Sequence, residues 1–136
     1  MSSIVFYIGS ITSDQDRFVE RAQELGYRVF DKEKFNLSVQ AAIQDACPGI
    51  VLYVDDIELL AVMFKDIALG EGRDVRVFTH PEELLTELRG LSPEEVGGVY
   101  SDRHFNRSRP HPNYDGFTLL RRAQEILDVG VKETSA

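Results

Sequence analysis

The sequence predicts an α/β fold in which a five-stranded parallel sheet is covered by helices on both faces. Short apolar runs alternate with helical patterns along the whole chain, which is typical of strand–helix units joined by right-handed crossovers. The run Ile50–Val54 is apolar throughout, as in a strand buried on both faces. The 136 residues suit one domain with one substantial core. We expect a single domain over residues 1–130 and a flexible tail over 131–136.

The elements follow from local signals in chain order. The first helix has capping-box spacing at Ser13 and Asp16 and ends at Gly26. A second capping box, from Thr79 to Glu82, has Pro81 at the first helical position. Strands are predicted over 4–8, 27–30, 50–54, 75–78 and 96–100, and helices over 13–25, 37–46, 57–69, 81–89 and 116–129, with a long polar loop over 101–115.

Composition excludes several classes of function. The net charge of -8 disfavours general binding of nucleic acid. Cys47 is the single cysteine, so no intramolecular disulfide can form, as is usual in the cytosol. No apolar run approaches the ~20 residues of a membrane span, and the start of the chain lacks the pattern of a signal peptide. We therefore expect a cytoplasmic protein that binds neither nucleic acid nor membrane.

Three acidic residues follow two of the predicted strands. Asp55 and Asp56 end the run Ile50–Val54, and Asp102 follows Val99-Tyr100-Ser101. In open α/β sheets the carboxyl ends of the strands form the ligand-binding edge. Three carboxylates in one site are costly unless a cation is bound. The group suits magnesium-assisted transfer of a phosphoryl group to an aspartate, and a nearby lysine and hydroxyl would complete it by binding phosphoryl oxygens.

Residues 50–128 resemble the first half of a response-regulator receiver domain. They present, in the family's order, a strand with an acidic pair, a second strand and helix, a third strand that ends in the phosphoacceptor, and a proline-to-glycine turn before a helix. The segments that carry this resemblance are Val51-Leu-Tyr-Val-Asp55-Asp56, Val75–Phe78 with Thr79-His-Pro-Glu-Glu-Leu-Leu, Val99-Tyr-Ser-Asp102, and Pro112-Asn-Tyr-Asp-Gly116 with Phe-Thr-Leu-Leu-Arg-Arg.

Residues 4–46 resemble the second half of the same family. Ile4 to Ser10 is similar to the fourth strand with its hydroxyl residue, Glu20 to Lys32 to the fourth helix and the fifth strand with its lysine, and Phe35 to Ile43 to the fifth helix. We interpret the chain as a circularly permuted receiver domain, with the family strands in the order 4-5-1-2-3. This implies a flavodoxin-like three-layer sandwich whose sheet order, in chain numbering, is 4-3-5-1-2.

The resemblance also implies the site residues and their roles. Asp102 would be the phosphoacceptor, and Ser10 and Lys32 would bind phosphoryl oxygens. Thr12 and Lys34 remain alternatives to Ser10 and Lys32, because they lie close to the same motif positions. The implied ligands of Mg²⁺ are Asp55, Asp56, Asp102 and the backbone carbonyl of His104.

The function implied is that of a phosphoacceptor in two-component signal transduction. A histidine kinase or a phosphotransfer protein would donate the phosphoryl group to Asp102. A downstream protein target would be reached by protein–protein contact, since no output module follows the domain. No enzymatic activity is expected beyond self-phosphorylation and self-dephosphorylation of the receiver aspartate.

Three alternatives stay open at the level of sequence. One is a pseudo-receiver, an interaction module that keeps the fold and is never phosphorylated. Another is a receiver in direct order with Asp55 as acceptor and Thr79 as hydroxyl residue, but this lacks an acidic pair on the first strand and has Arg103 where a lysine is required. The last is a flavodoxin-like nucleotide-binding protein, against which no Gly-rich phosphate loop follows any strand.

Overall fold

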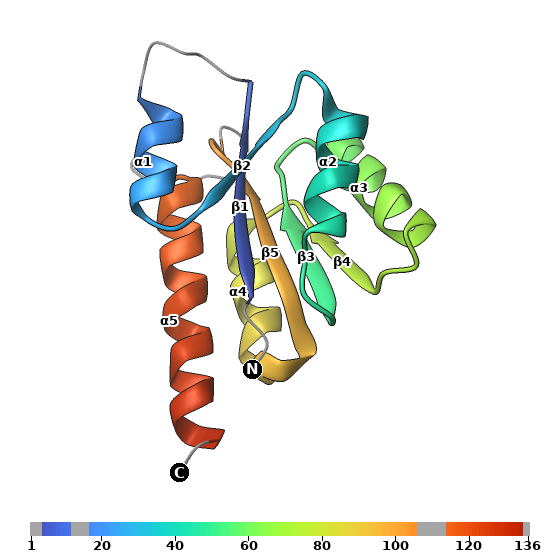
Figure 1. Ribbon diagram of the computed structural model, residues 1–136. Helices are drawn as coiled ribbons and strands as arrows, with labels where there is room; N and C mark the ends of the chain where they lie inside the picture. The colour runs from blue at the N-terminus through green and yellow to red at the C-terminus, as the bar shows by residue number, and fades with distance from the viewer. Residues whose placement is uncertain (1–3, 12–16, 106–113, 135–136) are drawn as a thin grey trace.

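The computed structural model describes residues 4–11, 17–105 and 114–134. Strands and helices alternate along the chain, as predicted (Figure 1). The strands are β1 (Val5–Ser10), β2 (Arg28–Asp31), β3 (Ile50–Val54), β4 (Val75–Phe78) and β5 (Val96–Asp102). The helices are α1 (Phe18–Glu24), α2 (Phe35–Gln44), α3 (Glu58–Gly70), α4 (Pro81–Arg89) and α5 (Gly116–Thr134), with a short 3-10 turn, η1 (Pro93–Glu95).

The strands form one parallel sheet in the order β2-β1-β5-β3-β4. This is the predicted order 4-3-5-1-2, read from the other edge. The deciding contact is between β1 and β5, which pair from Val5 with Gly98 to Gly9 with Asp102. A receiver in direct order would instead give 2-1-3-4-5, so this sheet does not have the direct-order arrangement.

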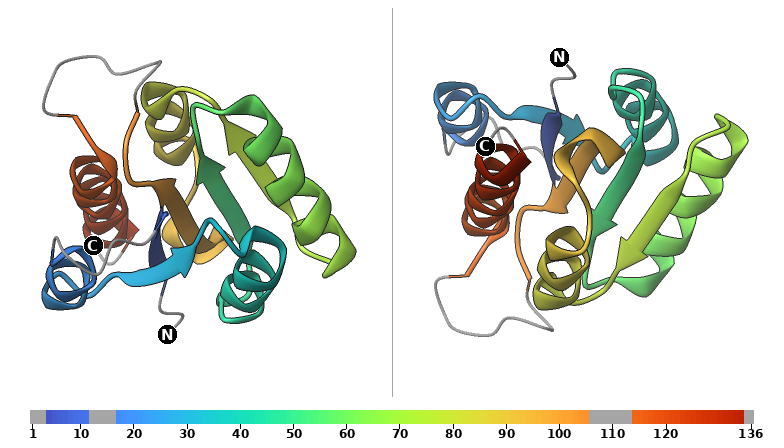
Figure 2. Two further views of the ribbon diagram at one scale, coloured as in Figure 1. Left: turned by 90° about the horizontal axis from the view of Figure 1, so that it is seen from above. Right: turned by 90° about the horizontal axis from the view of Figure 1, so that it is seen from below.

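Helices cover both faces of the sheet, which gives the flavodoxin-like three-layer arrangement seen in Figures 1 and 2. On one face α1, α4 and α5 pack on the sheet through an apolar cluster that includes Ile8, Leu52 and Val99. On the other face α2 and α3 pack through a second cluster, which includes Tyr7, Val51 and Tyr53. Each strand supplies both clusters because successive side chains point to opposite faces.

The structure extends or corrects several predicted boundaries. β1 and β5 continue to Ser10 and Asp102, so both of these predicted site residues are the last residues of strands. α2 begins at Phe35, two positions earlier than predicted. α5 does not end at Val129 but reaches Thr134, so it continues into the segment expected to be a flexible tail. The helical pattern there was missed because the residues after Val129 are mostly polar.

The two predicted capping boxes have different outcomes. The box at Ser13 and Asp16 lies outside the described residues. α4 begins at Pro81, as predicted, but its N-cap is His80 and no side-chain bond caps it. Proline at the first helical position fixes a helical φ and has no N–H to satisfy, so this helix can begin without a capping side chain.

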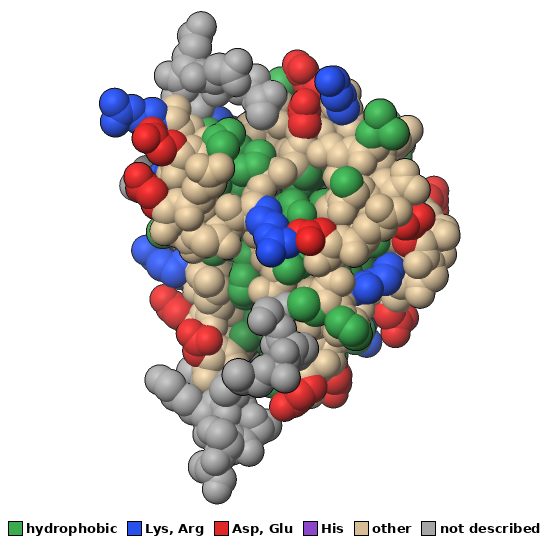
Figure 3. All heavy atoms as spheres, in the orientation of Figure 1, with side chains coloured by type: hydrophobic (Ala, Val, Ile, Leu, Met, Phe, Trp, Pro, Cys, Tyr) green, Lys and Arg blue, Asp and Glu red, His purple; other side chains and the backbone are tan. Residues whose placement is uncertain are grey.

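The surface carries charges of both signs. In Figure 3 acidic and basic side chains are interspersed with apolar patches on the face shown. Among the described residues, no helix combines the length and the apolar character that crossing a membrane requires.

Gly9 is required for the packing of the second strand against the first. A Cβ at this position would lie 2.2 Å from Cζ of Phe30, a ring that is 2 % exposed and cannot move aside freely. We predict that Gly9→Ala lowers the free energy of unfolding by about 1–3 kcal/mol, because it overpacks this contact. Urea denaturation measures the change.

Gly70→Ala is the matched control for this prediction. Gly70 is the last residue of α3, and a Cβ added there would have open space for 4 Å around it. The same substitution there should raise stability by roughly 0.5–1 kcal/mol, because glycine is a poor helix former. Equal effects of the two substitutions would contradict the proposed overpacking at Gly9.

Candidate functional site

The three acidic residues meet at the carboxyl ends of two neighbouring strands. Val54 pairs with Ser101, so the residues that follow, Asp55 and Asp102, lie side by side. One carboxylate oxygen from each of Asp55, Asp56 and Asp102 lies within 4.8 Å of the others. Asp55 is fully buried and Asp102 is 7 % exposed, whereas Asp56 is half-buried. The cluster can hold a metal ion.

Lys32 is the basic partner of this cluster. Its Nζ lies 2.8 Å from Oδ1 of Asp102 and 2.9 Å from Oδ2 of Asp55, and its side chain is largely buried. The backbone N–H of Lys32 donates to the carbonyl of Ser10 at 3.1 Å. This bond continues the pairing of β2 with β1 by one residue beyond the end of β2. Lys34 is exposed, so Lys32 is the lysine that the fold brings to the acids.

An aromatic residue lies two positions before each of Lys32, Asp55 and Asp102. The pairs are Phe30 on β2 with Lys32 just after it, Tyr53 on β3 with Asp55 just after it, and Tyr100 with Asp102, both on β5. Because residues two apart in a strand point to the same face, the rings lie in one layer below the charges. Tyr53 and Tyr100 both pack on Phe64, with ring centroids 4.3 and 5.2 Å away. Sequence reasoning missed this layer, although the repeated spacing was available as a signal.

The buried position sets the protonation behaviour of the site. Burial, together with the charge of Asp55, raises the pKa of Asp102 to about 6, against the opposing effect of Lys32 and the Arg103 N–H. Burial alone would lower the pKa of Lys32, but the charges of Asp102 and Asp55 outweigh it and the pKa is raised. Lys32 therefore stays charged at neutral pH.

The two oxygens of Asp102 have different surroundings. Oδ1 accepts a hydrogen bond from Lys32 Nζ and another from the backbone N–H of Arg103, each 2.8 Å long. Oδ2 accepts none from the part of the chain that the structure describes. Asp55, by contrast, is bonded on both oxygens: Oδ1 accepts the N–H of Ile57 at 2.9 Å, and Oδ2 accepts Lys32 Nζ and the hydroxyl of Tyr53.

A cavity of about 380 Å³ opens beside Asp102. Its walls combine acidic, basic and apolar side chains, and Ser10 contributes its hydroxyl group, which donates to the carbonyl of Ile11 at 3.2 Å. Thr12, the alternative to Ser10, lies outside the described residues. The lining residues are Ser10, Ile11, Lys32, Asp56, Ile57, Asp102, Arg103 and His104.

The first residues after Asp102 are held against the rest of the fold by several contacts. His104 forms an isolated antiparallel bridge with Asp115, and the carbonyl of Arg103 accepts the N–H of Gly116 at 2.8 Å. The guanidinium of Arg103 lies over the ring of Phe18, 4.4 Å from its centre. These contacts fix His104, whose carbonyl is the remaining implied metal ligand, at the cavity wall; residues 106–113 of the expected loop lie outside the described residues.

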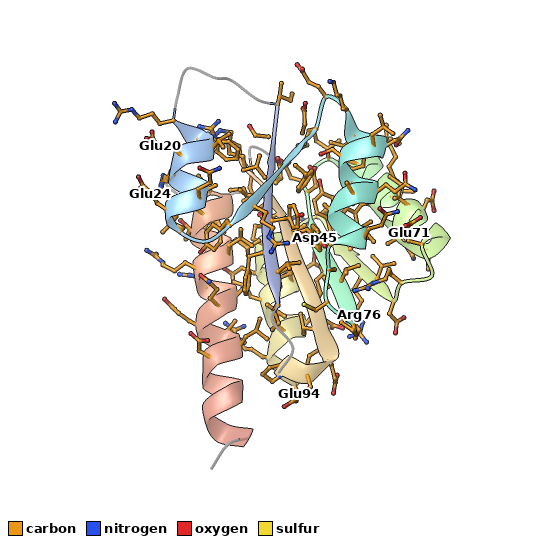
Figure 4. All side chains as sticks on the ribbon, in the orientation of Figure 1. Glu20, Glu24, Asp45, Glu71, Arg76 and Glu94 are labelled. Atoms are coloured by element: carbon orange, nitrogen blue, oxygen red, sulfur yellow. The ribbon has the colours of Figure 1, made fainter. Side chains whose placement is uncertain are left out.

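The donor set fits a hard divalent cation such as Mg²⁺. Carboxylate oxygens are the ligands that this ion prefers, and three aspartates offer one each within 4.8 Å of one another. The charged residues labelled in Figure 4 are instead partly or fully exposed. They are Glu20, Glu24, Asp45, Glu71, Arg76 and Glu94.

The fold and site define an α/β protein of flavodoxin-like kind with a buried acidic cluster that can hold a metal ion. Comparison of the chain with protein-family models, with curated proteins and with solved structures found no match. Any narrower assignment therefore depends on the order of the strands and on the geometry of the site.

The raised pKa of Asp102 predicts a pH dependence of stability in the absence of metal. The folded state binds the proton of Asp102 more tightly than the unfolded state, because the pKa is about 6 instead of 3.8. The contribution of this group to stability therefore falls as pH rises from about 4 through about 6. Asp102→Asn should remove this loss and stabilise the metal-free protein at pH 7 by roughly 1–3 kcal/mol.

Thermal unfolding of both proteins between pH 4.5 and 7.5 measures this effect. Asp74→Asn, at an exposed acid that precedes β4, controls for the loss of one negative charge and should stabilise the protein at pH 7 less than Asp102→Asn does. A destabilised Asp102→Asn protein at pH 7 would contradict the electrostatic description of the site.

Proposed function

We propose that the protein is a circularly permuted receiver domain that accepts a phosphoryl group on Asp102, with Mg²⁺ as its cofactor. The observation that carries this proposal is the unequal hydrogen bonding of the two oxygens of the Asp102 carboxylate. Lys32 and the Arg103 N–H bind Oδ1, while Oδ2 accepts no bond from the described residues and belongs to a residue that lines the cavity. Asp55 is bonded on both oxygens, so Asp102 is the better nucleophile.

The chemistry is a single displacement at phosphorus. Oδ2 of Asp102 attacks the phosphorus of a phosphohistidine; the O–P bond forms as the N–P bond breaks, and the electron pair stays on the imidazole nitrogen, which takes a proton from solvent. A divalent cation held by Asp55, Asp56, Asp102 and the carbonyl of His104 would neutralise charge on the transferred group. Ser10 and Lys32 would bind its oxygens, since both line the same cavity as Asp102.

The position of Lys32 supports a role in signalling as well as in binding. Before any ligand binds, its ammonium group is shared between Asp55 and Asp102. A phosphoryl group on Asp102 offers new anionic oxygens, so Lys32 would exchange partners and alter the end of β2. A downstream protein would detect this change by contact. The donor would be a histidine kinase or a phosphotransfer protein, and the chain would catalyse only its own phosphorylation and dephosphorylation.

A non-phosphorylated pseudo-receiver is the second candidate. The observation that favours it is that Lys32 already pairs with two of the three acids, so the cluster is held together without a cation. In that case the site would be a structural ion-pair network, and the module would act through its surface alone.

Phosphorylation of Asp102 is the direct test of the proposal. Incubation with acetyl phosphate and Mg²⁺ should add one phosphoryl group, which peptide mapping of the borohydride-trapped adduct should locate on Asp102. Asp102→Asn should abolish the mass shift and the exposed control Asp74→Asn should retain it. Lys32→Ala should still be phosphorylated but show a smaller conformational response. Failure to incorporate phosphate from several donors would favour the pseudo-receiver.

Magnesium binding is expected to stabilise the folded protein. A ligand that binds only the native state raises its stability by mass action, so millimolar Mg²⁺ should raise the melting temperature of the wild type. Asp55→Ala should abolish this gain, because it removes one of the three carboxylates of the cluster. Differential scanning fluorimetry with and without Mg²⁺ makes the measurement, and an unchanged wild-type melting temperature would count against the metal site.

A further inference from the structure

Tyr53 is fully buried beneath the acidic cluster. Its ring stacks on Phe64, with centroids 4.3 Å apart and planes at 16°, and meets the ring of Phe30 edge-on at 6.0 Å. Phenylalanine would make the same ring contacts. The hydroxyl group is therefore not required for packing, and burying it costs free energy unless it is hydrogen-bonded.

The hydroxyl group of Tyr53 donates a hydrogen bond to Oδ2 of Asp55, and the two oxygens lie 2.5 Å apart. Burial, with the nearby charge of Asp55, raises the pKa of Tyr53 well above its usual value, so the phenol stays protonated and acts as a donor. Lys32 Nζ lies 2.9 Å from the same oxygen. One carboxylate oxygen thus has two donors, of which one is charged and the other neutral.

The two donors respond differently to a ligand in the site. A divalent cation repels the Lys32 ammonium group, and a phosphoryl group attracts it away from the carboxylates. Without a second donor, Oδ2 of Asp55 would then accept no hydrogen bond in its buried position, and contact with the cation through one lone pair would leave the other unsatisfied, which is costly. The hydroxyl group of Tyr53 carries no net charge, so a cation does not expel it.

We propose that Tyr53 is a positioning residue of the acidic site, whose hydroxyl group keeps Asp55 hydrogen-bonded when Lys32 moves away. It thereby lowers the cost of admitting a divalent cation, although it does not contact the cation itself. The role of Tyr53 rests on the proposed function in one respect, that the cluster binds such a cation. Tyr53 would lower the free-energy cost of replacing the Lys32 ammonium group with that cation.

Tyr100 supplies a matched control. It is fully buried on the neighbouring strand and packs on the same Phe64 ring. Its hydroxyl group, however, donates to the backbone carbonyl of Ala42 at 2.6 Å, away from the acids. Tyr53→Phe and Tyr100→Phe therefore remove the same atom from the same aromatic layer, and only the first removes a donor to the cluster.

The test is a titration of the full chain with Mn²⁺, with free Mn²⁺ measured by electron paramagnetic resonance. Tyr53→Phe should weaken binding about ten-fold, the lower end of the effect of a hydrogen bond to a charged group. Tyr100→Phe should stay within about two-fold of the wild type. In a Lys32→Met background the same Tyr53→Phe substitution should change the affinity less than about two-fold, because no lysine remains to be displaced.

A second measurement uses the wild-type protein and so does not depend on the folding of any variant. With tyrosine labelled with ¹³C at Cζ, addition of Mg²⁺ should shift the Tyr53 resonance, since its hydroxyl group becomes the main remaining donor to Oδ2 of Asp55. The Tyr100 resonance should not move. A Tyr53 resonance that is insensitive to Mg²⁺ in protein that binds Mg²⁺ would overturn the inference.

The outcomes separate this inference from the proposed function. If the wild type binds Mn²⁺ and Tyr53→Phe binds it as Tyr100→Phe does, the positioning role is wrong and the metal site stands. An equal loss in the wild-type and Lys32→Met backgrounds would also overturn the role, because it would show a structural effect independent of the lysine. If the wild type binds no divalent cation, both proposals fail.

Discussion

The shared ion pair of Lys32 is the interaction on which the site depends. One ammonium group bonds Asp55, which follows β3, and Asp102, at the end of β5, at 2.9 and 2.8 Å. Lys32 itself follows β2, at the edge of the sheet. Two buried carboxylates side by side would otherwise repel each other strongly. Because all three groups are largely buried, solvent screens the attraction of Lys32 for the two carboxylates only weakly. A ligand that takes Lys32 away therefore disturbs three strands at once.

The order of the strands makes this contact possible. β1 and β5 are paired in the interior of the sheet, and Gly9 on β1 has no side chain, so the ring of Phe30 crosses over it toward Tyr53. Lys32 follows the same path two residues later. In the proposed permutation, α2 corresponds to the last helix of a receiver in direct order and β3 to its first strand. Only residues 45–49 join these two elements. The joining segment is short because these ends already lie near each other in the compact fold.

Much of this arrangement could be predicted from the sequence because it depends on local patterns. The apolar run before Asp55 and the strand before Asp102 predicted a sheet edge with clustered acids, and the motif order predicted the pairing of β1 with β5. The hydrogen bond from Tyr53 to Asp55 could not be predicted. A tyrosine in a buried strand fits the apolar pattern as well as a phenylalanine does, and the direction of its hydroxyl group depends on tertiary packing. The polar end of α5 was missed for the opposite reason: it lacks the apolar periodicity on which the prediction relied.

In the proposed function, Lys32 leaves the two carboxylates when a phosphoryl group occupies the site. The most direct measurement is nuclear magnetic resonance of the ¹⁵Nζ-labelled lysine side chains, with Mg²⁺ and beryllium fluoride as a mimic of the phosphoryl group. The Lys32 signal should shift on addition of the mimic, and Asp102→Asn should abolish the shift. A Lys32 signal that stays unchanged with Mg²⁺ and the mimic present would contradict the proposed movement of Lys32.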